Sequence, residues 1–314
     1  MFDIVAKRKW FFLFSAVIII PGLIFIGLGG LKLGIDFTGG TIWQVKFQHP
    51  TQEIEPLVAK GVLTANGYGD AQVQTAGTDS IIVRMKELKE GSPEKAKLEA
   101  ALAQVYGPVD ERGSQLQTVG PTVGATISER AIEAVAAASI GILLYIAYAF
   151  RRAQHPFRFG ACAIIAMLHD VLVVIGIFAI LGEFFGIEID ALFVTALLTV
   201  IGFSVHDTIV VFDRVRENVI RRVGTDFADI VNYSIVQTLV RSLNTSLTVV
   251  FTLLALYLFG GETIKDFVLA LLIGIISGTY SSIFNASLML VVWENRELVD
   301  FVNRFRPGRP AAAA

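Results

Sequence analysis

Long apolar runs, separated by short charged clusters, dominate the pattern of hydrophobic and polar positions along this chain. A helix that crosses a lipid bilayer needs about 20 consecutive, mainly apolar residues. Six runs reach that length, so the pattern predicts six membrane-spanning helices. We expect them at residues 10–31, 132–150, 159–182, 189–212, 235–261 and 267–293. The first run is longer than the core of a signal peptide and has no A-x-A-like cleavage site after it, so we expect a retained anchor.

The segment 32–130, between the first two runs, has a different pattern. Four short stretches rich in strand-forming residues alternate with two helical stretches. We expect strands at 41–47, 71–75, 81–85 and 114–119, and helices at 52–64 and 92–106. The second helix starts with Ser92 and Pro93, a common capping pair. The order β-α-β-β-α-β is that of the ferredoxin-like split motif. The expected fold class is therefore an α-helical polytopic membrane protein with an α+β ferredoxin-like domain.

The basic residues predict the orientation of the chain, because lysine and arginine collect in short cytoplasmic loops. They flank the runs on one side only: Lys7, Arg8, Lys9, Arg151, Arg152, Arg158, Arg214, Arg216, Arg221, Arg222, Arg296, Arg304, Arg306 and Arg309. The opposite short loops are mainly acidic, with Glu183, Glu188, Asp190, Glu262, Lys265 and Asp266. We therefore expect segments 1–9, 213–234 and 294–314 in the cytoplasm. The domain at 32–130 is expected on the external side.

Composition agrees with a membrane protein and excludes several classes of function. Hydrophobic residues make up 54% of the chain and charged residues 17%, against about 25% charged in a typical soluble domain. The net charge of −2 gives no electrostatic support for a nucleic-acid partner. A single cysteine, Cys162, excludes an intramolecular disulfide and a zinc-finger site, and we expect it to pack in the interior. No catalytic constellation is visible, so we expect no enzyme, no cofactor and no metal.

Two opposite charges stand in neighbouring predicted spans. An ionisable residue in a spanning helix costs about 2.5–3.5 kcal/mol on insertion scales. Asp207 and Arg241 both lie about 9 Å below the expected cytoplasmic boundary, at a rise of about 1.5 Å per residue. One hypothesis is a carboxylate that gains and loses a proton beside a fixed guanidinium. The other is an ion pair that holds two helices in register.

Two histidine–aspartate pairs occur in the spans. Asp170 lies near the middle of the third run, next to His169, and His206 precedes Asp207 in the fourth. Neighbouring residues project about 100° apart on a helix, so the members of a pair need not share a role. His169 is either a proton relay or a polar contact between helices. For His206 we favour packing or hydrogen bonding over a part in proton transfer.

Small and polar residues line one face of the sixth run. Gly274, Gly278, Ser281 and Asn285 follow each other at helical spacing, which allows another helix to approach closely. Packing inside the chain and docking of a partner both fit this stripe.

A glycine pair follows the first run, in the segment from Asp36 to Gly39 and Gly40. Glycine permits backbone conformations that a β-carbon blocks. The segment is either a hinge between the first span and the domain or a plain turn into the first strand.

Several of these stretches resemble the SecF family of protein-export membrane proteins. They are residues 34–41 (GIDFTGGT), residues 201–218 (IGFSVHDTIVVFDRVREN), residues 119–124 (VGPTVG), the His169–Asp170 pair and residues 241–246 (RSLNTS). One position differs, because His206 stands where that family usually has asparagine.

The resemblance implies half of an RND-type transporter, located in the bacterial inner membrane. It implies work with SecD beside the SecYEG channel, with SecA and YidC nearby, and use of the proton gradient to promote preprotein translocation. The implied partners are these proteins, the preprotein and membrane lipid. Two other hypotheses are a half-transporter that exports a small hydrophobic molecule and a scaffold that holds the translocon together without proton coupling.

Overall fold

A computed structural model describes residues 3–151, 155–295 and 297. The chain divides into two compact units. The helix bundle comprises Met1–Lys32 and Ala134–Ala314, and the sheet domain comprises Leu33–Glu133. Among the described residues, six helical segments are long and apolar enough to cross a membrane, which confirms the expected fold class.

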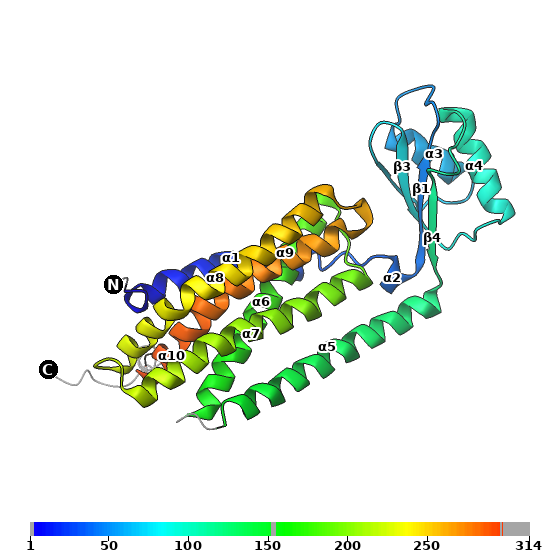
Figure 1. Cartoon of the computed structure of the whole chain (residues 1–314). Coiled ribbons are helices and arrows are strands. Elements are labelled where there is room, and N and C mark those ends of the chain that lie inside the picture. Colours follow the sequence, from blue (N-terminus) through cyan, green and yellow to red (C-terminus); the bar gives the residue numbers. More distant parts are fainter. Residues whose placement is uncertain (1–2, 152–154, 296, 298–314) are drawn as a thin grey trace, which may run out of the picture. The chain divides into compact units, whose positions relative to one another are not determined.

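The six segments are made of the following elements (Figure 1). The first is η1 (Val5–Lys7) with α1 (Arg8–Leu28), followed after the sheet domain by α5 (Pro121–Ala149), α6 (Pro156–Phe185), α7 (Ala191–Arg221) and α8 (Phe227–Phe259). After η2 (Glu262–Ile264), the sixth segment consists of α9 (Lys265–Tyr280), η3 (Ser281–Ala286) and α10 (Ser287–Glu294). In α6, α7 and the sixth segment, at least half of the most apolar stretch is buried inside the bundle. In the first span, α5 and α8, less than a fifth of that stretch is buried.

Several helices continue beyond the apolar runs that predicted them. The expected cytoplasmic loop 213–234 is mostly helical, because α7 continues to Arg221 and α8 starts at Phe227. Ion pairs one helical turn apart, such as Arg221–Glu217 at 2.7 Å, support this polar end of α7. Asp226 caps α8 by accepting a hydrogen bond from the amide of Asp229. The expected second span likewise starts earlier, since α5 begins at Pro121.

A π-helical segment interrupts the sixth span. Residues Ser281–Ala286 (η3) form hydrogen bonds one residue longer than those of an α-helix. Ser281, Ser282 and Asn285 are all buried there. Single π turns inside α-helices are rare and occur frequently at functional sites.

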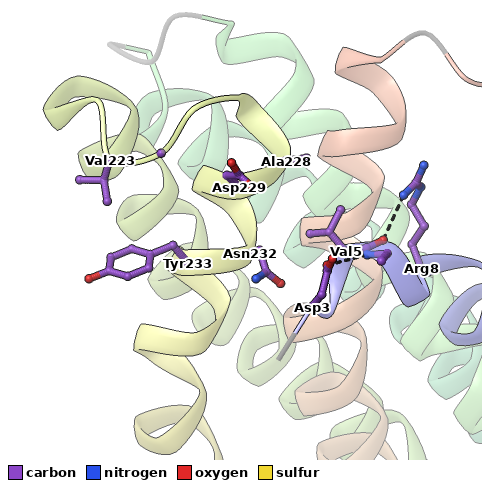
Figure 2. A pocket seen from close by; sticks show the side chains of 10 residues that line it. Asp3, Val5, Arg8, Val223, Ala228, Asp229, Asn232 and Tyr233 are labelled. Atoms are coloured by element: carbon purple, nitrogen blue, oxygen red, sulfur yellow. Dashed lines mark hydrogen bonds between the residues drawn. The ribbon is translucent and has the colours of Figure 1, made fainter. Parts of the chain in front are cut away.

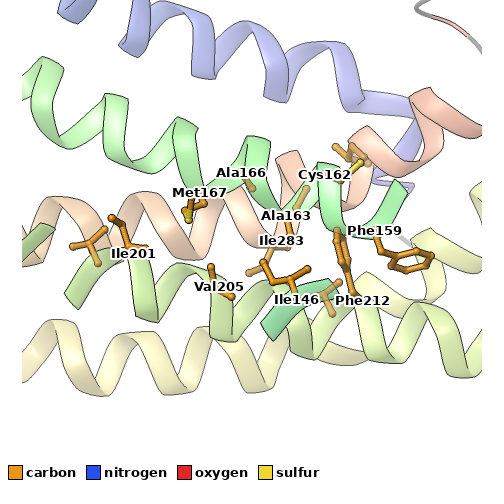
Figure 3. Packing of buried hydrophobic residues seen from close by; sticks show 14 of the residues in the cluster. Ile146, Phe159, Cys162, Ala163, Ala166, Met167, Ile201, Val205, Phe212 and Ile283 are labelled. Atoms are coloured by element: carbon orange, nitrogen blue, oxygen red, sulfur yellow. The ribbon is translucent and has the colours of Figure 1, made fainter. Parts of the chain in front are cut away.

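The interior of the bundle contains an aromatic cluster at the end where α5 meets α6 (Figure 3). Phe150, Phe159 and Phe212 pack with ring centroids 5.3 to 5.7 Å apart. Cys162 is fully buried beside them as a free thiol, as expected for a packing residue. Farther along α6, the backbones of Gly22 and Gly176 touch, so that a β-carbon on Gly22 would lie 2.7 Å from the Cα atom of Gly176.

The sheet domain has the expected β-α-β-β-α-β order. Its elements are β1 (Gly40–Lys46), α3 (Pro56–Ala65), β2 (Gln72–Thr75), β3 (Ser80–Met85), α4 (Pro93–Tyr106) and β4 (Gln115–Val119). The strand order is β2-β3-β1-β4, with every pair antiparallel. Alternate residues of β1, such as Trp43 and Val45, are buried against Leu63 of α3 and Leu102 of α4. The ferredoxin-like prediction is confirmed.

The glycine pair at the start of β1 is held in a tight turn after the short helix α2 (Ile35–Thr38). Gly39 has φ +72° and Gly40 has φ +127°, which are values that favour glycine. A β-carbon on Gly39 would lie 2.9 Å from the Cα atom of Pro121, and one on Gly40 would lie 2.9 Å from the carbonyl oxygen of Met85. These contacts give the turn a structural basis, and the hinge role stays a prediction.

We predict that Gly40→Ala destabilises the sheet domain by at least about 1 kcal/mol, because the substitution combines a strained φ with a backbone clash. Gly61→Ala is the matched control, since Gly61 lies inside helix α3 with open space around it. Alanine there should stabilise α3 by about 0.5–1 kcal/mol. Hydrogen exchange of the sheet-domain amides in the full chain measures both. Equal protection in the two variants would contradict this account of the turn.

Candidate functional site

The side chain of Asp170 is fully buried in the bundle and accepts hydrogen bonds from three serines. Ser204 Oγ on α7 and Ser281 Oγ on η3 donate to Oδ2 at 2.5 and 2.6 Å. Ser277 Oγ on α9 donates to Oδ1 at 2.8 Å. The exposed fraction of Asp170 is 0%. We refer to Asp170 and these serines as the Asp170 cage, which joins three helical segments at one carboxylate.

His169 extends the Asp170 cage to α1. Its Nδ1 lies 3.0 Å from Asp170 Oδ1, and its Nε2 lies 3.0 Å from Ser15 Oγ. Asn285 Nδ2 donates to the same Ser15 oxygen at 2.7 Å. The adjacent residues His169 and Asp170 therefore do act on one another, although their positions on the helix differ by about 100°.

The chemistry of the Asp170 cage is that of an anion site with a titratable partner. Three hydroxyl donors can stabilise a carboxylate, but hydroxyls carry no charge to balance it. Among the described residues, no lysine or arginine forms an ion pair with Asp170, and His169 is its basic neighbour. The pair can therefore be balanced by a proton that resides on the carboxyl or on the imidazole.

Asp207 has a much poorer set of partners, although its exposed fraction is only 3%. Its one hydrogen bond in the described part of the chain comes from Ser246 Oγ on α8, at a long 3.4 Å. Ser246 itself accepts a bond from Thr279 Oγ1 on α9 at 2.6 Å. This environment offers an anion far less stabilisation than the Asp170 cage does.

The expected pairing of Asp207 with Arg241 is absent from the described residues. The buried face of α8 repeats every three or four residues: Val231, Ser234, Ile235, Thr238, Ser242 and Ser246. Arg241 lies next to Ser242 and therefore projects about 100° away from that face, where it is exposed. Matching depth alone did not specify which way the guanidinium points.

His206 lies on the surface of the bundle. His206 is exposed on α7, so interior packing does not account for it.

The glycine stripe of the sixth span packs against α7. Gly274 and Gly278 face α7 closely, and a β-carbon on Gly278 would lie 3.2 Å from Ser204 Cβ and 3.6 Å from Asp170 Oδ2. Ser281 and Asn285 continue into the hydrogen bonds described above. The stripe therefore packs inside the chain and leaves no free face for a partner.

Sequence reasoning missed Ser15, Ser204 and Ser277. Ser277 and Ser281 stand one helical turn apart, and that spacing is a weak signal for a shared face. Nothing along the chain marks Ser15, because it reaches His169 only through the packing of α1 on α6.

Two cavities lie near the end of the bundle where α1 begins. The larger, about 670 Å³, lies between the start of α1 and the turn from α7 to α8 (Figure 2). Arg8, a basic residue that lines this cavity, is already paired with Glu297 at 2.5 Å. Burial raises the pKa of Glu297, but hydrogen bonds from Arg8 and Asn295 and the positive charges of Arg8 and Lys9 together hold that pKa below its ordinary value. The smaller cavity, about 90 Å³, adjoins His169 and Ser15.

Comparison with known proteins assigns the chain to a family. Residues 97–296 match the family of the protein export membrane protein SecD/SecF, C-terminal, and residues 24–51 match the SecD/SecF GG motif. The protein translocase subunit SecF of Thermobaculum terrenum is 61% identical over the full length of both chains. The protein translocase subunit SecDF of Bacillus subtilis is 36% identical over 94% of this chain and 38% of its own length.

A solved structure agrees with these matches. The crystal structure of SecDF from Thermus thermophilus, a translocon-associated membrane protein, superposes with a TM-score of 0.80 at 32% identity. The match covers 94% of this chain and 39% of that one. The chain therefore belongs to the SecF family of protein translocase subunits.

Proposed function

We propose that the chain works with a SecD half to convert the proton gradient into preprotein export, with His169–Asp170 and Asp207 as the groups that exchange protons. The contacts of Asp170 support this most directly. A buried carboxylate whose basic neighbour is a histidine changes its charge balance whenever one proton arrives or leaves. A permanent ion pair with lysine or arginine would not respond in this way.

The two carboxylates act on the same helical segment. Ser277 and Ser281 of the sixth segment donate to Asp170, while Thr279 between them reaches Asp207 through Ser246. A proton that arrives at either carboxylate changes the hydrogen bonds on one side of this segment. The adjoining π-helical turn is a place where such a segment can adjust its backbone. Proton exchange and helix movement are thus coupled through one element.

Orientation and location are part of the proposal. Arg158, Arg214, Arg216 and Arg221 lie at one end of the bundle helices, whereas Glu183 lies at the other end of α6. By the positive-inside rule the termini are cytoplasmic and the sheet domain is external, in a bacterial inner membrane. The terminal arginines at 296, 304, 306 and 309, and Arg152, lie outside the described residues.

The exposed face of α8 is the proposed contact with SecD. Arg241, Thr245 and Thr248 are exposed on one side of a membrane-spanning helix, where a charged side chain facing lipid is costly. A protein partner that supplies an acceptor removes that cost. The fused SecDF relative, of which this chain covers 38%, supports a SecD half as that partner. The SecYEG channel, SecA, YidC and the preprotein are the further partners of the proposal.

The orientation is tested with single cysteines in a Cys162→Ser background. Gln74 in the sheet domain and Thr225 in the turn between α7 and α8 are both exposed. A membrane-impermeant thiol reagent added to intact cells should label Gln74→Cys and leave Thr225→Cys unlabelled. The opposite pattern would reverse the assignment of the two sides.

Asp207→Asn should abolish the stimulation of export by a proton gradient and leave stability within about 1 kcal/mol, because a single long hydrogen bond is affected. Asp170→Asn should abolish stimulation too, with a stability loss of about 1–3 kcal/mol from the disrupted Asp170 cage. Translocation into inverted vesicles, with and without a gradient, is measured beside a melting curve.

Asp213→Asn is the matched control, since Asp213 lies on the same helix as Asp207 and forms an exposed ion pair with Arg216. It should retain full stimulation. If Asp207→Asn were also fully stimulated, the chain would act as a scaffold without proton coupling.

Arg241→Gln should reduce co-purification with SecD at least fivefold, while the bundle keeps its melting temperature because Arg241 makes no ion pair within the described residues. Arg221→Gln is the control, because Arg221 is an exposed arginine at the polar end of α7. Pull-down of tagged protein in mild detergent measures both. Undiminished recovery of SecD with Arg241→Gln would place the interface elsewhere.

A further inference from the structure

We propose that Thr279 of α9 is a positioning residue for proton coupling, which reports the protonation of Asp207 to the sixth segment. The basis is its single hydroxyl hydrogen, for which two acceptors compete. This inference rests on the proposed function, because it needs Asp207 to gain and lose a proton. It specifies how that change reaches the helix.

The hydroxyl of Thr279 has one hydrogen but two acceptors within reach. Its Oγ1 lies 2.6 Å from Ser246 Oγ on α8 and 2.8 Å from the carbonyl oxygen of Ile275, one turn earlier in α9. A threonine hydroxyl donates only one hydrogen bond. Thr279 is buried, with an exposed fraction of 7%. The choice between the two acceptors is therefore made inside the bundle.

Ser246 connects this choice to Asp207. Ser246 Oγ lies 3.4 Å from Asp207 Oδ2 and, like Thr279 Oγ1, carries one hydrogen. An ionised carboxylate only accepts hydrogen bonds, so Ser246 then donates to Asp207 and accepts from Thr279. In this state the Ile275 carbonyl receives no hydrogen bond from the threonine hydroxyl.

A proton on Asp207 reverses the direction of this chain of hydrogen bonds. The new carboxyl hydrogen is donated to Ser246 Oγ, and the Ser246 hydrogen turns to Thr279 Oγ1. The Thr279 hydrogen then turns to the Ile275 carbonyl. Each hydroxyl keeps one hydrogen throughout, and the added proton stays on the carboxyl. Loss of that proton restores the first arrangement.

The Ile275 carbonyl converts the reversal into a change in the helix. A threonine hydroxyl that bonds to the carbonyl four residues earlier competes with the backbone hydrogen bond and promotes bending of the helix. The π-helical segment begins at Ser281, directly after this turn of α9. The bend therefore forms beside the part of the sixth segment whose backbone is already irregular.

Ser281 repeats the arrangement at the other buried carboxylate. Its hydroxyl also has one hydrogen and two acceptors, which are Asp170 Oδ2 at 2.6 Å and the Gly278 carbonyl oxygen at 3.2 Å. Thr279 and Ser281 thus each divide one hydrogen between a carboxylate, directly or through Ser246, and the backbone of their own helix. The sixth segment can respond to both carboxylates through the same kind of contact.

The charged and titratable groups near Asp207 leave this role to the hydroxyls. His206, adjacent on α7, is the titratable neighbour whose charge acts on Asp207, and it is exposed. On α8, Arg241 projects away from the buried face. On α9, the Tyr280 hydroxyl donates to a carbonyl of α1, and on α6, Asp170 has its own donors. Within the described residues, the polar contacts that reach Asp207 from α8 and α9 are hydroxyls.

Infrared difference spectroscopy of the full chain in liposomes, between acidic and alkaline buffer, tests the contact. The carboxyl band that is missing in Asp207→Asn belongs to Asp207, and Thr279→Val should shift it, because valine keeps the shape and removes the hydroxyl. Thr238→Val is the matched control and should leave the band unchanged. Thr238 is 6% exposed on α8 and donates only to carbonyls of its own helix. An Asp207 band at the same position in Thr279→Val would overturn the proposal.

Export of preprotein into inverted vesicles tests the role. Thr279→Val should lower gradient-stimulated export at least fivefold, whereas Thr279→Ser, which keeps the hydroxyl, should stay within twofold of the unmodified chain. Thr238→Val should stay fully stimulated. Full stimulation in Thr279→Val, or a loss in Thr279→Ser as large as that with valine, would exclude Thr279 from the coupling.

Ser246→Ala interrupts the same chain at its other hydroxyl, and it tests the proposal even if Thr279→Val does not fold. It should also lower stimulation at least fivefold, and full stimulation would overturn the proposal. The double variant with Thr279→Val should be no worse than either single one, because both changes break one chain. Effects that multiply would show that the two hydroxyls act independently, which the proposal excludes.

The infrared result separates a failure of this inference from a failure of the proposed function. If no carboxyl band depends on Asp207, that residue does not exchange a proton, and both are wrong. If the Asp207 band is present but does not respond to Thr279→Val, proton exchange at Asp207 stands and only the role of Thr279 is overturned.

Discussion

The hydrogen bonds that converge on Asp170 are the interaction on which the rest of the bundle depends. A buried carboxylate must be solvated by the protein, and here the donors come from α7, α9 and η3. Each donor fixes the rotation of its own helix, because a turn of about 100° would remove it from reach. Gly278 adds a steric condition, since a side chain there would meet Ser204 and approach Asp170. One carboxylate thereby specifies how three segments face one another.

The sixth segment connects the Asp170 cage to the neighbouring helices. It contacts α6 at Asp170, α7 at Val200 and Ser204, and α8 at Ser246. The outer helices α1, α5 and α8 bury much less of themselves. The exposed faces of the outer helices are left for lipid or for a partner to cover.

Much of the fold could be predicted from the sequence, because the apolar runs and the alternation of strand residues report directly on burial. The positions of the helix ends were harder to predict, because ion pairs such as Arg214–Glu217 stabilise the helix beyond the apolar run. Asp170, His169 and Asp207 were found because ionisable groups are rare inside membrane-spanning runs. Ser15, Ser204 and Ser277 were missed because serine is unremarkable along a chain. The predicted pairing of Asp207 with Arg241 was wrong, because it used the depth of Arg241 in the membrane and not the direction in which its side chain leaves α8.

The π-helical segment decides where in the sixth span a change of length alters the fold. Its longer hydrogen bonds accommodate one residue more than a regular helix would over the same rise. Removing one residue between Ser281 and Ala286 would restore the regular helix and leave α10 in about its present orientation, whereas removing one residue from α9 would rotate everything after it by about 100°. The buried residues Leu290 and Val291 would then turn away from the core. Among homologous chains, a single-residue deletion should therefore be tolerated in this segment but not in α9.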